Sequence, residues 1–228
     1  MCGIVAYIGE QDATPIVVSG LKKLEYRGYD SAGIAILENE QIQIRRVAGK
    51  IDKLKKLVEQ NPVHGKIGIG HTRWATHGAP NEQNAHPHVG MSGKIVVVHN
   101  GIVENYLRLR DELVAEGVEF KSETDTETIA HLIEAFYSEN NDLSSAVQRA
   151  LRMIRGAHGV VVLSTEEPDR LIAARLGNAG GVSIGIGDGE MFIASDIPAI
   201  VGYTRKFVFL ESGQIAVIQK DQYTVQDL

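Results

Sequence analysis

The sequence predicts an α+β fold in which helices lie on largely antiparallel sheets. About a dozen apolar stretches have strand length, against four or five stretches with helical periodicity. Short turns join many of the strands, and regular strand–helix–strand alternation is missing, which favours antiparallel pairing. No linker rich in Pro, Gly or Ser divides the 228 residues, so we expect a single domain over residues 1–228.

Strand-length apolar runs, several of them bounded by turn residues, define the predicted strands. They cover residues 3–9, 32–37, 41–47, 67–73, 94–100, 159–163, 171–174, 182–187, 191–194, 206–210 and 214–218. The run 41–47 alternates Ile with Gln and Arg, so one of its faces should be wet. Asp188-Gly189 and Ser212-Gly213 are typical of hairpin turns.

Apolar residues at helical spacing predict helices over residues 15–24, 51–58, 107–114, 129–137 and 142–154. Pro15 suits a first helical turn, and Asn61-Pro62 stops the second helix. The spacing of Thr124 and Glu127 predicts a capping box before the fourth helix.

Composition narrows the function classes. The chain is 43% hydrophobic and 23% charged, which excludes intrinsic disorder, and its formal charge of −6 argues against nucleic-acid or anionic-membrane partners. No apolar stretch approaches the roughly 18 residues of a membrane span, and no signal peptide is visible. One cysteine permits neither an internal disulfide nor a thiolate metal cage. We therefore expect a cytoplasmic globular protein.

That cysteine is Cys2, and two interpretations of it stay open. Its small size permits removal of Met1, which would leave a thiol and an α-amine on one residue. An α-amine with a pKa of about 7.7–8.0 accepts protons at neutral pH, so Cys2 could be a nucleophile activated by its own amine. Alternatively, Cys2 merely precedes a buried strand.

A second group of candidates follows the strand 67–73. Arg73 offers a two-pronged donor for a carboxylate, Thr76 and His77 add polar donors, and Trp74 provides an apolar lid. The alternative is a surface arginine beside a core tryptophan.

A third group lies near residue 100. Asn100-Gly101 ends an apolar strand and is followed by a helix rather than a strand, so the Asn amide and the Gly N–H could stabilise an oxyanion. Asp125 stands at a helix start, where it either caps the helix or binds a substrate ammonium.

Neither a metal nor a cofactor is predicted. The histidines near this region lack acidic or thiolate ligands at a familiar spacing; they are His71, His77, His86 and His88. The glycine-rich stretch 185–189 lacks the spacing and context of a dinucleotide fingerprint.

Taken together, the segments closely resemble the class II glutamine amidotransferases over nearly the whole chain. The start, residues 1–5, resembles the nucleophile terminus of that family. Five further segments match in order: residues 24–33, 71–78, 84–88, 99–105 and 122–127. The residues in these segments are similar to those of the branch of the family that forms amino sugars. The phosphoribosylpyrophosphate branch usually reads Arg-Gly-Gln-Asp where this chain has Arg27-Gly28-Tyr29-Asp30, and it lacks the Trp-Ala-Thr-His run.

The resemblance implies an N-terminal-nucleophile fold, a four-layer αββα sandwich. It also implies that Cys2 attacks L-glutamine through a glutamyl thioester, giving glutamate and ammonia, with Asn100 and Gly101 as the oxyanion hole. Arg73 would hold the substrate α-carboxylate, with Thr76 and His77 beside it, and Asp125 would hold the α-ammonium. Trp74 resembles the gate of an ammonia channel, and His86 faces the partner domain in the family.

The resemblance further implies a C-terminal sugar-isomerase domain, absent from this chain, that binds fructose 6-phosphate, and a homodimeric full-length enzyme. Two departures stand out: Ala6 replaces a frequent glycine, and residues 178–181 replace a Ser-Pro pair with a stretch two residues longer. Three alternatives remain: another class II amidotransferase such as the phosphoribosylpyrophosphate enzyme, a non-catalytic glutamine-sensing module, and a β-rich domain with a structural Cys2.

Overall fold

The computed structural model describes residues 2–228, so Met1 and its predicted removal lie outside the described residues. Within them, seven strands form the first sheet, in the spatial order β11 (Lys206–Phe209), β9 (Ser183–Ile186), β10 (Met191–Ala194), β1 (Gly3–Ile8), β4 (Ile67–Arg73), β2 (Ser31–Glu38) and β3 (Gln41–Ala48). Six form the second sheet, in the order β13 (Tyr223–Asp227), β12 (Gln214–Ile218), β8 (Leu171–Leu176), β7 (His158–Ser164), β6 (Ile95–Gly101) and β5 (His88–Val89). The strand pairs are antiparallel, as predicted.

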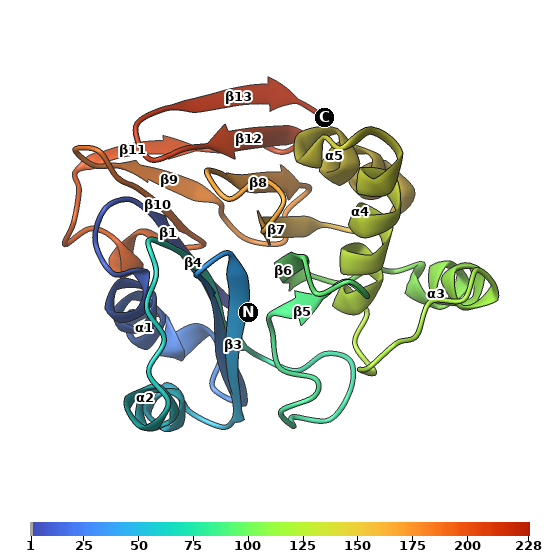
Figure 1. The fold of residues 1–228 in the computed structure, drawn as a ribbon, viewed down its shortest axis with the longest axis horizontal. Helices are drawn as coiled ribbons and strands as arrows, with labels where there is room; N and C mark the ends of the chain where they lie inside the picture. The colour runs from blue at the N-terminus through green and yellow to red at the C-terminus, as the bar shows by residue number, and fades with distance from the viewer. Residues whose placement is uncertain (1) are drawn as a thin grey trace.

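Helices cover the outer face of each sheet (Figure 1). The first sheet carries α1 (Ala13–Lys23) and α2 (Ile51–Gln60), and the second carries α4 (Thr126–Asn140) and α5 (Leu143–Met153). The remaining helix, α3 (Tyr106–Ala115), packs beside α4, and two short 3₁₀ turns, η1 (Glu25–Arg27) and η2 (Ile197–Ala199), complete the described helical elements. This arrangement is the four-layer αββα sandwich, so the predicted fold class is confirmed.

Residue parity along the strands divides the core into three layers. In β1, Ile4 packs between the sheets, whereas Val5 packs under α1. In β6, Val98 packs between the sheets, whereas Val97 packs under α4 and α5. Because both faces of these central strands are covered, their sequences read as continuous apolar runs.

Two predictions about turns have different outcomes. Asp188-Gly189 joins β9 to β10 as a hairpin, as predicted. Ser212-Gly213 does not make a hairpin, because the strands that flank it belong to different sheets and the chain crosses over between them here. The edge strand β13 was not predicted, since its residues are polar and half exposed and give a weak hydrophobic signal.

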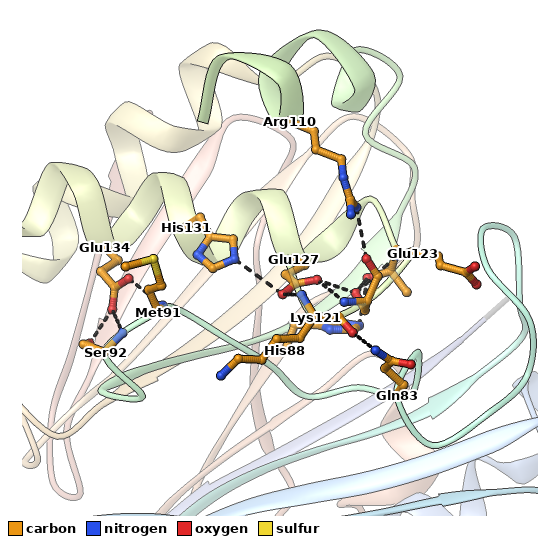
Figure 2. Close-up of polar contacts among 12 residues, drawn as sticks. Gln83, His88, Met91, Ser92, Arg110, Lys121, Glu123, Glu127, His131 and Glu134 are labelled. Atoms are coloured by element: carbon orange, nitrogen blue, oxygen red, sulfur yellow. Dashed lines mark hydrogen bonds and ion pairs between the residues drawn. The ribbon is translucent and has the colours of Figure 1, made fainter. Parts of the chain in front are cut away.

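The start of α4 also differs from the prediction. Instead of capping the helix, Glu127 accepts hydrogen bonds from the backbone N–H of Lys121 and Ser122, each at 2.7 Å, and from the Ser122 hydroxyl at 2.6 Å (Figure 2). Burial opposes ionisation of Glu127, but the nearby His131 side chain and the hydrogen bonds from Lys121 and Ser122 outweigh it and lower its pKa. The buried carboxylate therefore holds the segment that leads into the helix.

A second carboxylate on α4 anchors the turn between β5 and β6. Glu134 accepts hydrogen bonds from the backbone N–H of Met91 at 2.6 Å and of Ser92 at 2.9 Å (Figure 2). One helix thus fixes two loops beside the second sheet.

Candidate active site

Strand parity brings three distant parts of the sequence to one end of the gap between the sheets. Cys2 precedes β1 and shares the parity of Ile4, which faces the second sheet. His71 and Arg73 on β4 share the parity of the inter-sheet residue Ile69. Asn100 on β6 shares the parity of Val98, which faces the first sheet.

Contacts from β6, from η1 and from the residue after β4 hold Cys2. Its Sγ accepts a hydrogen bond from the backbone N–H of Trp74 at 3.2 Å. Its carbonyl oxygen accepts from Asn100 Nδ2 and from Arg27 Nε, each at 3.1 Å. The backbone of the candidate nucleophile is thereby tied to β6 and to η1.

Burial raises the pKa of the Cys2 thiol above its ordinary value, although the Trp74 N–H and the charge of Arg73 act in the opposite direction. The raised pKa favours the protonated thiol. Because the thiolate is the nucleophilic form, a reaction at Cys2 needs a base nearby.

The Asn100-Gly101 pair ends β6 in a conformation that requires glycine. Gly101 has φ of +141°, and a Cβ there would lie 2.1 Å from the Ala157 carbonyl oxygen. The Asn100 amide is oriented on both sides, because its Oδ1 lies 3.1 Å from His71 Nε2 while its Nδ2 points toward Cys2.

A cleft of about 410 Å³ opens over these residues. It is lined by Cys2, Trp74, Thr76, Asn100, Gly101, Ile102, Glu104, Ala157, Asn178 and Ala179. Half of this set was predicted from sequence. Asn178 and Ala179 were not, although they belong to the segment in which the chain departs from the family pattern. A larger cleft of about 720 Å³ lies between α1 and α2 and contains none of the candidate residues.

Arg73 is buried, and its guanidinium faces the loop that follows β4. It donates to the carbonyl oxygens of His77, Gly78 and Ala79, the last two at 3.4 and 3.5 Å. The same loop is fastened by Asp30, whose carboxylate accepts from the backbone N–H of Ala75. No role was predicted for Asp30, and its place in the matched segment 24–33 is the signal in the sequence that could have pointed to it.

Asp125 occupies the N-cap position of α4, but its side chain makes no capping hydrogen bond. Its Oδ2 accepts a hydrogen bond from the backbone N–H of Val103 at 2.7 Å, so it joins the segment after β6 to the helix. Burial raises its pKa, while the Val103 N–H and the nearby charge of His77 oppose the rise. The capping interpretation is therefore wrong, and the role of Asp125 toward an ammonium stays a prediction.

The other predicted residues lie in two settings. Trp74 is 49% exposed and packs edge-on against Tyr29, with ring centroids 5.5 Å apart; Thr76 is also exposed. His77 packs edge-on against Tyr106. His86, in contrast, is buried and stacks on His71 with ring centroids 4.0 Å apart.

Among residues 2–228, no group of His, Cys, Asp and Glu side chains is arranged to hold a metal ion. Within the same range, no helix has the length and apolar character needed to cross a membrane.

A cysteine at the head of a central strand, facing an Asn-Gly pair across the gap of an αββα sandwich, defines an amidotransferase of the N-terminal-nucleophile class. Comparison with known proteins agrees with this. A family model described as a glutamine amidotransferase domain matches residues 71–201. The chain belongs to the glutamine amidotransferase family.

Similar proteins include two enzymes named glutamine–fructose-6-phosphate aminotransferase (isomerizing). The one from Caldanaerobacter subterraneus is 53% identical over the whole chain, and the one from Pyrococcus horikoshii is 52% identical over the whole chain. The chain spans only 37% and 38% of their lengths. Among solved structures, glutamine phosphoribosylpyrophosphate amidotransferase from B. subtilis aligns with a TM-score of 0.85 at 27% identity. That alignment covers 99% of this chain and 49% of that one.

Proposed function

We propose that this chain hydrolyses the side-chain amide of L-glutamine and supplies the ammonia to a sugar phosphate. One observation carries the proposal. A cysteine at the head of β1 and an Asn-Gly pair at the end of β6 line the same cleft from opposite sheets. A glutamine-sensing module has no need of a nucleophile paired with oxyanion donors.

The first half-reaction forms a glutamyl thioester. After removal of Met1, the α-amine of Cys2 takes the thiol proton, and the sulfur attacks the carboxamide carbon of glutamine. The carbonyl oxygen becomes negative and is stabilised by the Asn100 amide and the Gly101 N–H. The carbon–nitrogen bond then breaks, and the leaving nitrogen takes the proton from the α-amine to depart as ammonia.

The second half-reaction returns the enzyme to its starting state. The α-amine removes a proton from water, the hydroxide oxygen attacks the thioester carbon, and the carbon–sulfur bond breaks. Glutamate leaves, and the sulfur of Cys2 recovers its proton from the amine.

We assign recognition of glutamine to residues beside the cleft, of which Thr76 also lines it. Arg73 would hold the substrate α-carboxylate, with Thr76 and His77 beside it, and Asp125 would hold the α-ammonium. Because the Arg73 guanidinium is occupied by carbonyl oxygens of residues 77–79, the substrate carboxylate has to replace those contacts. A carboxylate is a stronger partner for a guanidinium than neutral carbonyls are, which favours the exchange.

The acceptor of the ammonia is proposed from the relatives. Two of them are named for transfer to fructose 6-phosphate and are about half identical to this chain, against 27% for the phosphoribosylpyrophosphate enzyme. We therefore propose that residues 1–228 form the glutaminase domain of a cytoplasmic, homodimeric enzyme of amino-sugar synthesis. Its remaining part would be a sugar-isomerase domain that binds fructose 6-phosphate. In that enzyme Trp74 would gate the ammonia channel, whereas the burial of His86 against His71 argues against its facing the partner domain.

The glutaminase proposal is tested on purified protein whose loss of Met1 is verified by intact mass. Glutamate and ammonia released from glutamine are measured together, with asparagine as the control substrate. We expect equal amounts of both products from glutamine and little from asparagine. Saturable binding of glutamine without turnover would instead make the chain a sensing module.

The acceptor is tested with the longer protein that we propose contains this chain. It is supplied with glutamine and either fructose 6-phosphate or phosphoribosylpyrophosphate. We expect glucosamine 6-phosphate from the first mixture. Formation of phosphoribosylamine from the second would establish the alternative branch.

A further inference from the structure

We propose that His71 is a positioning residue that fixes the Asn100 amide in its catalytic orientation. The inference rests on the proposed function, in which Asn100 stabilises the oxyanion. His71 is not among the residues that line the cleft, so its effect is exerted through Asn100.

His71 bridges the two sheets at the site. It lies on β4 directly opposite Ile4 of β1, two residues from the nucleophile. From there its Nε2 reaches across to β6, where it lies 3.0 Å from the His99 carbonyl oxygen and 3.1 Å from Asn100 Oδ1. One ring nitrogen thus joins the sheet that carries Cys2 to the sheet that carries the oxyanion donors.

The two partners decide which tautomer His71 adopts. The His99 carbonyl oxygen can only accept a hydrogen bond, so Nε2 has to carry the proton. A protonated Nε2 in turn requires the oxygen of the Asn100 amide on its side. If that amide turned over, its NH₂ would face the Nε2–H and its oxygen would face the Cys2 carbonyl oxygen, with two like pairs in contact. The His71 tautomer therefore holds Asn100 Nδ2 toward the reaction centre.

The surroundings keep His71 in this single neutral form. Its ring is 1% exposed and stacks on the ring of His86, and its Nδ1 has no hydrogen-bond partner among the described residues. A second proton would therefore create a buried, unpaired N–H beside another imidazole and the cationic Arg73. Burial accordingly lowers the pKa of His71 to about 3.

Two substitutions separate positioning from packing. His71→Leu removes the donor, whereas His71→Gln retains an N–H at the reach of Nε2. At saturating glutamine, we expect kcat of His71→Leu to fall roughly 10–100-fold, part of the loss on the order of 10²–10³ that removal of an oxyanion donor causes. KM should change less than about threefold, and His71→Gln should recover most of kcat. A rise in KM with an unchanged kcat would overturn the proposal.

A matched control comes from another buried histidine. His131 on α4 lies 3.4 Å from Glu127 and is not among the residues that line the cleft. His131→Leu should lower the melting temperature and leave kcat unchanged. If kcat of both leucine variants falls in proportion to the decrease in their melting temperatures, His71 acts only through stability and the proposal is wrong.

A double substitution tests whether the effect passes through Asn100. In the Asn100→Ala background, His71→Leu should cost less than about twofold in kcat, because the group it positions is gone. An undiminished 10–100-fold loss in that background would contradict the proposal.

A spectroscopic readout works without turnover. Ring ¹⁵N shifts of His71, recorded between pH 5 and 8, should show the neutral Nε2–H tautomer throughout, and His71→Gln should shift the Asn100 side-chain amide signals. A Nδ1–H tautomer or a doubly protonated ring would overturn the inference even if the protein hydrolysed glutamine. An inactive wild-type protein with the expected tautomer would instead refute the proposed function alone.

Discussion

The two halves of the site are built differently. The strand half, with Cys2 and Asn100, lies at the ends of β1 and β6, where neighbouring strands fix the backbone; Asn100 is 3% exposed. The loop half follows β4 and includes Trp74, which is 49% exposed. The loop is held by Asp30 and Arg73 through backbone contacts. The difference teaches that the two sheets fix the positions of Cys2 and Asn100, whereas the loop after β4 leaves Trp74 and Thr76 exposed to solvent.

The largest effect should come from the centre of the strand half. Cys2→Ala should abolish release of ammonia from glutamine, because no other thiol exists in the chain. The melting temperature should change little, since one small, half-buried side chain is lost. Turnover near the normal rate in a processed Cys2→Ala protein would remove Cys2 from the mechanism.

Retention of Met1, or of an N-terminal tag, should be nearly as damaging. It converts the α-amine of Cys2 into an amide, which cannot accept the thiol proton. The test compares ammonia release by processed and unprocessed protein, each identified by intact mass. Equal rates would show that another group is the base.

Asn100→Ala should lower kcat on the order of 10²–10³, because the donor is needed most when the oxyanion forms. Glutamine binding, measured separately by calorimetry, should change much less. Asn100→Asp should be at least as harmful, since a carboxylate repels the oxyanion. Weak binding with normal turnover would assign Asn100 to substrate recognition instead of oxyanion stabilisation.

In contrast to Asn100→Ala, Arg73→Lys should change KM more than kcat. A point charge replaces the two-pronged donor, so we expect KM for glutamine to rise roughly 10–100-fold, with most of kcat recovered at saturation. Asp125→Asn should raise KM as well, by loss of the ammonium contact. Unchanged KM in both variants would place the substrate clamp elsewhere.

The smallest effect concerns stability and pH. Folding lowers the pKa of His71 from 6.5 to about 3, so the unfolded chain binds more protons between these values. The stability linked to His71 is therefore present above pH 6.5 and is lost as the pH falls toward 3. His71→Gln should make the decline shallower by up to about 1.4 kcal/mol per pH unit, measured by urea unfolding. An unchanged slope would mean that His71 is not buried in its neutral form.

Much of the strand half could be predicted from the sequence. The apolar run before Asn100-Gly101 marked a buried strand. Which of its residues face the other sheet could not be predicted, because both faces of the strand are apolar. Five matched segments in order specified the family more firmly than any single motif did.

The rest of the fold and of the site depends on contacts between segments that are distant in sequence, which local patterns do not reveal. Nothing local to Ser212-Gly213 tells that its two flanking strands enter different sheets. Likewise, Asp125 has the local pattern of a cap, yet Val103, which is distant in sequence, offers it a backbone N–H. The contacts of Arg73 follow from the path of the loop after β4, which carries no periodic signal.

The most direct test of the account is to trap the intermediate. Processed protein is mixed with excess glutamine, quenched in acid within the first turnovers, and digested for mass spectrometry. We predict a glutamyl group bound to the sulfur of Cys2, present in the wild-type protein and absent in Cys2→Ala. Continued release of ammonia with no acyl group on Cys2, or with the group on another residue, would contradict it.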